Sequence, residues 1–405
     1  MNIAVEIKNL DVIFGSHINK AANLLDNGLS RQEIIDKTGD VVAVSNASLR
    51  VNKGEICVLM GLSGSGKSSL LRAVNGLNPI TRGSVEIEYD GNMIDLGSCN
   101  SATLRHIRTN KVSMVFQKFA LMPWLSVLEN VAFGLEIQGM SKHEREQKAH
   151  EQLKMVGLDE WAHQYPHELS GGMQQRVGLA RAFAMDSDIL LMDEPFSALD
   201  PLIRTQLQDE LMELQHQLNK TIIFVSHDLD EALKLGSKIA IMESGKIIQY
   251  GEPEAIVLKP EDQYVEDFVA HTNPLNVLRG QSLMTRLDEL KTKDQKIVLK
   301  EYEDTCLKLA FDGSIEQVTR QDKSLKVTHW QSSRDDFAAI EADSIVVTDL
   351  AISMRDALEL RYRSRQPVVL SDNGRILGIL RDQDFYHALL GKHFGHCAEN
   401  SVAAS

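Results

Sequence analysis

The sequence predicts an α/β domain built on a largely parallel sheet, followed by a smaller α+β region. Unbroken apolar runs of strand length, such as 188–193 and 221–225, alternate with helical stretches as far as about residue 275. Buried parallel strands are typically continuous apolar runs, because helices cover both faces of their sheet. After residue 275 this alternation stops and a β-hairpin signal appears. The 405 residues are enough for two or three domains.

The composition is that of a globular protein and weighs against some functions. Hydrophobic residues make up 43% and charged residues 25% of the chain, and the net charge is −14. This acidity argues against a nucleic-acid partner, which normally requires a basic surface. The N-terminus lacks the pattern of a signal peptide, and no apolar run reaches the roughly 18 residues that span a bilayer. We therefore expect a cytosolic or peripheral protein.

The α/β domain begins with two predicted strands that are separated by a helical insert. Residues 3–14 have strand patterning and residues 17–38 have helical patterning. Within the insert, Ser30 is expected to cap a helix, and Glu33 completes a capping box. Strand patterning resumes over 41–60 and ends in an apolar run directly before a glycine-rich loop. Further strands are predicted at 112–116, 188–193, 221–225 and 238–242.

Beyond residue 275 the sequence divides into an ambiguous part and a clear part. Residues 276–342 are charged and follow no clear pattern, so we expect a linker or a degenerate domain there. Residues 343–400 predict a small α+β unit. Its predicted elements are a strand at 343–348, a helix from its cap Ser353 to Arg363, two strands at 367–370 and 375–380 joined by Asp372-Asn373-Gly374, and a helix at 384–390.

The glycine-rich loop carries the pattern G-x-x-x-x-G-K-[ST] of a phosphate-binding loop. Its glycines let the backbone turn tightly so that N–H groups point at phosphate oxygens, and the next helix directs the positive end of its dipole to the same place. We expect Lys67 to reach the β- and γ-phosphates and Ser68 to bind Mg²⁺. The position between a buried strand and a helix is the context that this motif requires. The loop consists of Gly61, Leu62, Ser63, Gly64, Ser65, Gly66, Lys67 and Ser68.

Candidate hydrolytic residues follow two other apolar runs. Asp193 and Glu194 end the run 188–192; Asp193 would approach the metal, and Glu194 could polarise the attacking water as a general base. His227 ends the run 221–225 and would lie in the same crevice, because the carboxyl ends of parallel strands share one edge of a sheet. Two interpretations of His227 stay open. It takes part in catalysis, or it belongs to the cap of the next helix, a role that Asp228 could equally fill.

A second helix start suits an anion. Ser170, Gly171 and Gly172 precede a helical pattern of apolar residues, and a serine with two glycines at a helix N-terminus can bind phosphate. The chain would then have two phosphate-binding helix starts and one set of hydrolytic acids. Either both helix starts grip one nucleotide within the chain, or each site is shared by two chains of a symmetric dimer.

In this order, the motifs resemble the nucleotide-binding domain of ABC transporters over residues 3–275. The resemblance implies an α/β P-loop fold with a parallel core sheet, an antiparallel β subdomain and a helical subdomain. It implies the ABC motif at 169–175, the Q-loop residue Gln117, the D-loop at 197–200, and His227 as the switch histidine.

The same resemblance assigns ligands to individual residues. ATP and Mg²⁺ are the implied cofactors, and Phe14 is the aromatic residue expected to stack on adenine. The implied catalytic residues are Glu194, His227 and Lys67. The implied metal ligands are Ser68, Gln117 and Asp193. The implied nucleotide-binding residues are Phe14, Gly61, Ser63, Gly64, Ser65, Gly66, Lys67, Ser68, Ser69, Gln117, Ser170, Gly171, Gly172, Gln174 and Asp200.

Partners and location are also implied by the resemblance. In this family two ATP molecules are held in a homodimer, each between the phosphate loop of one chain and the ABC motif of the other. Integral membrane permease subunits would contact the segment after Gln117, near Met122-Pro123-Trp124, and a periplasmic or surface substrate-binding protein would take part indirectly. The chain would lie on the cytoplasmic face of the inner membrane, without a nucleic-acid partner.

Two features resemble the glycine betaine/proline/choline importers within this family. These are the insert at 17–38 and a C-terminal region that ends in a unit similar to a CBS (cystathionine-β-synthase) domain at 343–400. The resemblance makes 276–342 either a linker or a degenerate CBS-like segment. Residues 95–108 most resemble choline-transport members, so choline is favoured over glycine betaine and proline betaine. Arg381 replaces a threonine that commonly faces a nucleotide ribose in CBS domains. We therefore expect the C-terminal region to pack or dimerise rather than to sense a nucleotide.

Two alternatives remain. One is a soluble ATPase of the same family that acts on ribosomes or DNA, although such proteins usually have two cassettes or a coiled-coil insertion. The other is a non-enzymatic regulatory binder built on the CBS-like region, which the complete hydrolytic motifs disfavour.

Overall fold

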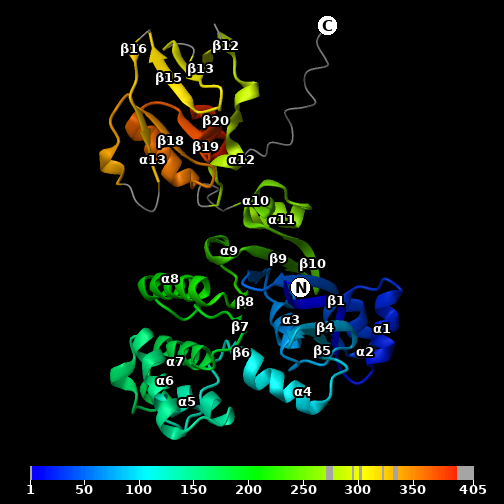
Figure 1. Cartoon of the computed structure of the whole chain (residues 1–405). Coiled ribbons are helices and arrows are strands. Elements are labelled where there is room, and N and C mark those ends of the chain that lie inside the picture. Colours follow the sequence, from blue (N-terminus) through cyan, green and yellow to red (C-terminus); the bar gives the residue numbers. More distant parts are fainter. Residues whose placement is uncertain are drawn as a thin grey trace. The chain divides into compact units, whose positions relative to one another are not determined.

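The computed structural model divides the chain into two compact units (Figure 1). It describes residues 2–270, 277–293, 296–300, 303–321, 323–331 and 336–389. The first unit consists of Met1–Ile256 and Pro260–Val265, and the second of Val257–Lys259 and Glu266–Ser405. Each unit has its own buried apolar residues. Among the helices in the described ranges, none is long and apolar enough to cross a bilayer.

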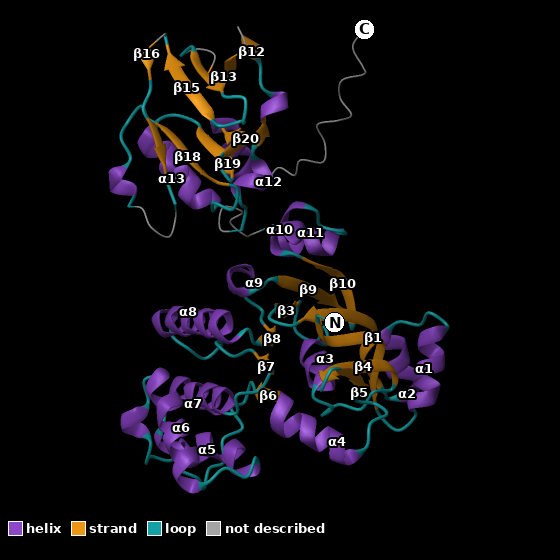
Figure 2. Ribbon diagram, in the orientation of Figure 1, coloured by secondary structure: helices purple, strands orange, loops and turns teal. Residues whose placement is uncertain are grey.

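A six-stranded sheet in the order β10-β9-β3-β8-β7-β6 forms the centre of the first unit (Figure 2). The strands from β9 to β6 are parallel, and β10 runs antiparallel at one edge. Every residue of β3, β7 and β8 is buried, which confirms the prediction of an α/β fold from unbroken apolar runs. The strands are β3 Ile56–Met60, β6 Val112–Val115, β7 Ile189–Asp193, β8 Thr221–Val225, β9 Lys238–Glu243 and β10 Lys246–Gly251.

An antiparallel sheet in the order β2-β1-β4-β5 packs against the central sheet. One apolar cluster joins Leu10 and Val44 of this sheet to Leu59 and Leu191 of the central sheet and to Leu70 of helix α3. This cluster fixes the phosphate loop, which connects β3 to α3, against both sheets. The elements are β1 Ile3–Phe14, β2 Val41–Asn52, β4 Arg82–Tyr89, β5 Asn92–Asp95 and α3 Lys67–Val74.

The predicted helical insert forms two short helices between β1 and β2. They are α1 Ile18–Asp26 and α2 Arg31–Thr38. The predicted capping box is confirmed, because Ser30 N–H donates to Glu33 Oε2 at 2.8 Å and Glu33 N–H donates to Ser30 Oγ at 3.3 Å. Ile34 is fully buried in a small apolar cluster. Arg31 Nη1 donates to the carbonyl of Gly64 at 3.1 Å, which ties the insert to the phosphate loop.

Helices α5, α6 and α7 pack on one another and form a helical subdomain (Figure 1). Helix α7 also contacts β6, so it links this subdomain to the central sheet. The remaining helices of this part of the chain are α4 Ser101–His106, a π-helical turn Ile107–Lys111, α5 Val127–Ile137, α6 Lys142–Met155, 3₁₀ turns Asp159–Trp161 and Pro166–Glu168, α7 Gly171–Ala184, α8 Pro201–Leu218, α9 Leu229–Leu235, α10 Pro253–Leu258 and α11 Gln263–Val269.

The second unit contains two five-stranded sheets. The sheet β11-β20-β19-β18-β17 is mixed, whereas β12-β13-β14-β15-β16 is antiparallel. Neighbouring residues of β18 face different cores: Val346 packs with Leu360 of α13, and Val347 packs with Leu307 of the antiparallel sheet. The mixed sheet is therefore covered on both faces. Its strands are β11 Thr285–Arg286, β17 Val327–His329, β18 Ile345–Asp349, β19 Val368–Asp372 and β20 Arg375–Leu380.

The elements predicted within 343–390 are present; the strand at 375–380 has the predicted ends, and the ends of the others are shifted by one to two residues. Ser353 caps α13 by accepting from the Asp356 N–H at 3.0 Å, and Asn373 and Gly374 adopt left-handed conformations in the hairpin turn. Residues 390–400 lie outside the described residues. The other elements of this unit are α12 Gly280–Leu283, 3₁₀ turns Leu287–Glu289 and Phe337–Ala339, β12 Thr292–Lys293, β13 Lys296–Lys300, β14 Thr305–Leu309, β15 Ile315–Arg320, β16 Lys323–Ser324, α13 Met354–Ser364 and α14 Asp382–Leu389.

Candidate active site

The phosphate loop between β3 and α3 depends on glycine at defined positions. Gly61, Gly64 and Gly66 have φ angles of 139°, 80° and 103°, a region that side chains disfavour. A Cβ atom on Gly66 would lie 2.4 Å from the carbonyl oxygen of Ala43 on β2. No larger residue fits there without moving the backbone, so the loop is held tightly in place.

Lys67 begins α3 and points back into the loop. Its Nζ donates to the carbonyl oxygens of Gly61 at 2.7 Å and Leu62 at 2.9 Å, and the residue is only 7% exposed. Burial lowers the pKa of Lys67, and the nearby carboxylates of Glu194 and Asp193 oppose this shift. A buried ammonium bonded to carbonyls gains strongly from an anionic ligand such as a phosphate.

Ser68 and Asp193 meet at the carboxyl end of β7. Ser68 Oγ donates to Asp193 Oδ1 at 2.7 Å, and Arg72 Nη2 donates to Asp193 Oδ2 at 3.0 Å. Asp193 is completely buried, so these two bonds replace its hydration. Arg72 lies on α3 one turn after Ser68, and no sequence pattern indicates its role.

Glu194 and His227 lie at the ends of neighbouring strands and face each other. Gln117 Nε2 donates to Glu194 Oε2 at 3.1 Å, and His227 Nδ1 lies 3.6 Å from the same oxygen. Asp228 caps α9 by accepting from the Glu231 N–H at 3.2 Å. The cap that the sequence leaves open is thus supplied by Asp228, and the His227 ring is directed to the site.

These residues suit a magnesium ion. Oxygen atoms are the ligands that this cation prefers, and the site offers the Ser68 hydroxyl and the Asp193 carboxylate side by side. Gln117 uses its amide nitrogen on Glu194, which leaves its amide oxygen for a metal. Within the described ranges, no group of three or more His, Cys, Asp and Glu side chains could hold a metal. A cation here would therefore rely on waters and phosphate oxygens for its other ligands.

Glu194 has an unusual backbone conformation. Its φ is +50°, which costs a residue other than glycine roughly 1–3 kcal/mol. Its N–H donates to the carbonyl of Val225 at 3.2 Å, and its own carbonyl accepts from Gln175 Nε2 at 3.1 Å. Gln175 lies within the ABC motif predicted at 169–175, but no role of its own was predicted for it. The available signal was a polar residue on the same helical face as the buried Leu179 and Ala182.

The second predicted phosphate-binding helix start is the N-terminus of α7. Ser170 caps this helix by accepting from the Met173 N–H at 3.3 Å. A Cβ atom on Gly171 would meet nothing within 4 Å, so the helix start is open. In the described part of the chain, no hydrogen bond is seen between Ser170, Gly171 or Gly172 and the phosphate loop.

The other predicted nucleotide-binding residues occupy separate positions. Phe14 is 36% exposed at the end of β1. Asp200 caps α8 by accepting from the Ile203 N–H at 3.1 Å, and Gln174 Nε2 donates to the carbonyl of Pro166 at 2.9 Å. Asp200 and Gln174 thus make local bonds. The serines of the phosphate loop and the following helix turn are Ser63, Ser65, Ser68 and Ser69.

Comparisons with known proteins agree with this geometry. A family model described as ABC transporter matches residues 44–197. The glycine betaine transport ATP-binding protein OpuAA of Bacillus subtilis is 46% identical over 361 residues, 89% of this chain and 82% of OpuAA. The glycine betaine/proline betaine transport system ATP-binding protein ProV of Escherichia coli is 51% identical over 286 residues, 71% of this chain and 70% of ProV. The glycine betaine/carnitine transport ATP-binding protein GbuA of Listeria monocytogenes is 39% identical and covers 96% of this chain and 98% of GbuA.

Solved structures of ABC cassettes share the fold. A dimeric structure of a post-hydrolysis state of the ATP-binding cassette MJ0796, bound to ADP and Pi, is 32% identical with a TM-score of 0.53. It covers 62% of this chain and 98% of that cassette. A second dimeric structure of MJ0796, described as a bacterial ABC transporter cassette, gives a TM-score of 0.54. The chain therefore belongs to the ABC transporter family, as an ABC ATPase and an ATP-binding subunit in the group that includes OpuAA, ProV and GbuA.

Proposed function

We propose that this chain hydrolyses ATP to power the import of a quaternary-ammonium solute across the bacterial inner membrane. The convergence of Ser68, Asp193, Gln117 and Glu194 at the carboxyl ends of neighbouring strands carries the hydrolytic part of the proposal. The transport part is supported by relatives that are named for transport of glycine betaine, proline betaine and carnitine.

The proposed chemistry assigns one task to each side chain. Ser68, Asp193 and the Gln117 amide oxygen would hold Mg²⁺, which would neutralise charge on the phosphates. Lys67 binds the same phosphates from the loop. Glu194 orients the attacking water and accepts its proton as general base, and His227 beside it stabilises the developing charge.

A homodimer would complete each site. Among the described residues, the open start of α7 makes no hydrogen bond to the phosphate loop of its own chain, so it is free to bind a nucleotide held by a second copy. The similar MJ0796 cassette is described as dimeric in both structures. We propose that Ser170, Gly171 and Gly172 of one copy face the phosphate loop of the other.

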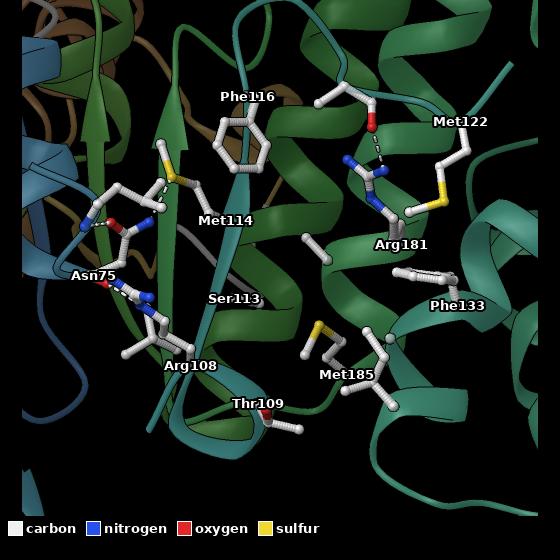
Figure 3. Close-up of a pocket in the computed structure, with 16 residues that line it drawn as sticks. Asn75, Arg108, Thr109, Ser113, Met114, Phe116, Met122, Phe133, Arg181 and Met185 are labelled. Carbon is white, nitrogen blue, oxygen red and sulfur yellow. Dashed lines mark hydrogen bonds between the residues drawn. The ribbon is translucent and has the colours of Figure 1, made fainter. Parts of the chain in front are cut away.

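A groove beside the helical subdomain suits a permease (Figure 3). Its cavity is about 360 Å³. Figure 3 shows Phe116, Met122, Phe133 and Met185 around it, with Asn75 and Arg108 on the opposite side. We propose that an apolar helix of the membrane subunit docks here, directly after Gln117, which would place the chain on the cytoplasmic face of the membrane.

Arg181 fastens the loop that borders this groove. Its guanidinium donates to the carbonyls of Phe119 at 2.9 Å and Ala120 at 2.7 Å, and both of these residues have a positive φ. Burial lowers the pKa of Arg181. Trp124, which is 73% exposed and lies two residues beyond the groove residue Met122, adds an aromatic contact for the same partner.

The proposal also covers the identity of the transported solute and the role of the second unit. Choline, which residues 95–108 favour, and glycine betaine, for which OpuAA is named, are the two candidate solutes. A substrate-binding protein would deliver the solute. We propose that the region from 276, with its CBS-like part at 343–400, packs or dimerises. Uptake of labelled choline and glycine betaine by vesicles that contain this chain, its permease and its binding protein distinguishes the solutes.

The substitution Glu194→Gln tests the hydrolytic mechanism. We expect ATP to bind as before, phosphate release to fall by about 10²- to 10⁴-fold, and the ATP-bound dimer to persist on size-exclusion chromatography. Glu136→Gln, on the exposed surface of α5, is the matched control. Near-normal phosphate release by Glu194→Gln would refute the assignment of the general base.

A further inference from the structure

Gln175 is a buried amide that joins α7 to the hydrolytic loop. The residue is 2% exposed. Its Nε2 donates to the carbonyl of Glu194 at 3.1 Å, and its Oε1 accepts from the N–H of Ala198 at 3.2 Å. Both ends of the amide are therefore used on one segment, which fixes that segment against the helix.

The segment held by Gln175 carries the general base of the proposed mechanism. Glu194 has a left-handed backbone conformation, and such a conformation persists only where surrounding bonds enforce it. Its carbonyl also accepts from Ser197 Oγ at 3.1 Å, but Ser197 belongs to the same loop. Gln175 is the buried side chain from another element that bonds to this carbonyl among the described residues.

The same helix carries the second phosphate-binding site. Gln175 lies five residues after Ser170, so the two are about 1.4 turns apart on a rigid helix. A Cβ atom on Gly172 would lie 3.4 Å from the carbonyl oxygen of Ala198. The start of α7 thus packs directly on the loop that Gln175 holds, and a movement of one displaces the other.

We propose that Gln175 is a positioning residue that couples the two nucleotide sites of the dimer. When Ser170, Gly171 and Gly172 engage the nucleotide on the partner copy, α7 is fixed. Gln175 then holds Glu194 of its own chain in the orientation that directs its carboxylate at the water. In each chain, binding of the partner's nucleotide at the ABC motif therefore aligns Glu194 of that same chain, which acts on the nucleotide in the other site. This inference rests on the proposed function.

The substitution Gln175→Leu removes both bonds while keeping the size of the side chain. We expect kcat for ATP hydrolysis to fall by about 10- to 100-fold, because a displacement of the order of 1 Å of a catalytic group has an effect of this size. The KM for ATP should stay within about twofold, since the phosphate loop is untouched. The Hill coefficient for ATP should fall toward one, because the sites lose their coupling.

Two further variants separate positioning from a general loss of structure. Gln215→Leu removes another buried amide, which donates to the carbonyl of Gly54 away from the site, and should leave kcat and the Hill coefficient unchanged. Gln175→Glu keeps an acceptor for the Ala198 N–H and loses the donor to Glu194. It should show the same loss of kcat as Gln175→Leu, with fluorescent ATP still bound at the affinity of the unsubstituted protein.

The outcomes separate this inference from the proposed function. If Gln175→Leu and Gln175→Glu keep kcat and the Hill coefficient while Glu194→Gln is inactive, the coupling role of Gln175 is wrong and the hydrolytic mechanism stands. If Gln175→Leu changes kcat no more than Gln215→Leu does, the positioning role is also wrong. Normal hydrolysis by Glu194→Gln would instead refute the hydrolytic part of the proposed function, because Glu194 would not be the general base.

Discussion

Asp193 in the first unit and Asp384 in the second are both buried aspartates next to an arginine, but their surroundings differ. Asp193 accepts one bond on each oxygen, from Ser68 Oγ and from Arg72. Asp384 accepts from the N–H of Arg381 at 2.7 Å and from Thr285 Oγ1 at 3.2 Å. One partner of Asp193 is thus a small hydroxyl that can share a metal, whereas Asp384 is surrounded by groups of its own fold.

Because of this difference, the Asp193 carboxylate can help to bind a ligand, whereas the Asp384 carboxylate helps to pack its own unit. The Arg381 guanidinium donates to Thr285 Oγ1 at 2.6 Å and lies 3.7 Å from Asp384, so it closes the space around that carboxylate. Burial raises the pKa of Asp384, as expected where a carboxyl group is enclosed by its own chain. We therefore expect nucleotide chemistry to depend on the first unit alone.

The largest expected effect comes from Asp193→Asn. We expect hydrolysis to fall by at least about 10²-fold, because the Mg²⁺ of the proposed mechanism would lose its anionic protein ligand. A phosphate-release assay at saturating Mg²⁺ and ATP measures this loss. The matched control is Asp384→Asn, which should hydrolyse ATP at the unsubstituted rate. Equal losses in the two variants would remove the distinction between the two aspartates.

A smaller effect is expected from Asp384→Ala on stability. The substitution leaves the Arg381 N–H and Thr285 Oγ1 without their buried acceptor, which should lower the free energy of unfolding by about 1–3 kcal/mol. Urea denaturation followed by the fluorescence of Trp330, a buried residue of this unit, reports the change. An unchanged midpoint would show that the bonds around Asp384 contribute nothing to folding.

A pair of serines that cap helices, one in each unit, allows a further comparison of the two units. Ser30→Ala and Ser353→Ala each remove an N-cap bond, so each should lower the free energy of unfolding by about 1 kcal/mol. Only Ser30→Ala should also raise the KM for ATP, because its helix carries the Arg31 contact to Gly64. Steady-state kinetics of both variants tests this, and a raised KM in Ser353→Ala would contradict the separation of the units.

The smallest expected effect concerns Glu231, a buried acid near the site that bonds to Ser226 and Gln208. Burial raises the pKa of Glu231, with Asp228 adding to the shift, above its ordinary value of 4.5. The stability it contributes is therefore complete below that value and is lost as the pH rises through the raised pKa. Glu231→Gln should flatten the decline in stability as the pH rises above 4.5, measured by urea denaturation at several pH values. A steeper decline of stability with pH in Glu231→Gln would contradict this expectation.

Much of the first unit could be predicted from the sequence, because its strands are buried on both faces. Runs such as Ile189–Asp193 are apolar throughout, and the glycines of the phosphate loop have a spacing that few other structures require. The position of His227 followed from the rule that parallel strands end at one edge. What the sequence left open was whether His227 or Asp228 caps α9, since this depends on a hydrogen bond rather than on a pattern.

Other features could not be predicted, for two physical reasons. Gln175 bonds to a segment about twenty residues away, and such a contact exists only after α7 has packed on the sheet. Strands β13 and β15 are short and partly exposed. The sequence of β13, KIVLK, has an apolar run of only three residues, and that of β15, IEQVTR, shows no clean alternation. The fold of residues 276–342 could therefore not be predicted from the pattern of apolar and polar residues.

The short outer strands of the second unit have a further consequence for how this protein behaves at high concentration. The antiparallel sheet ends in β12 and β16, two residues each, and both include an exposed lysine, Lys293 and Lys323. Unpaired backbone groups at such margins would otherwise recruit strands from neighbouring molecules, and brevity and positive charge both discourage this. Self-association by sheet extension, and with it aggregation during overexpression, is thereby disfavoured at this part of the surface.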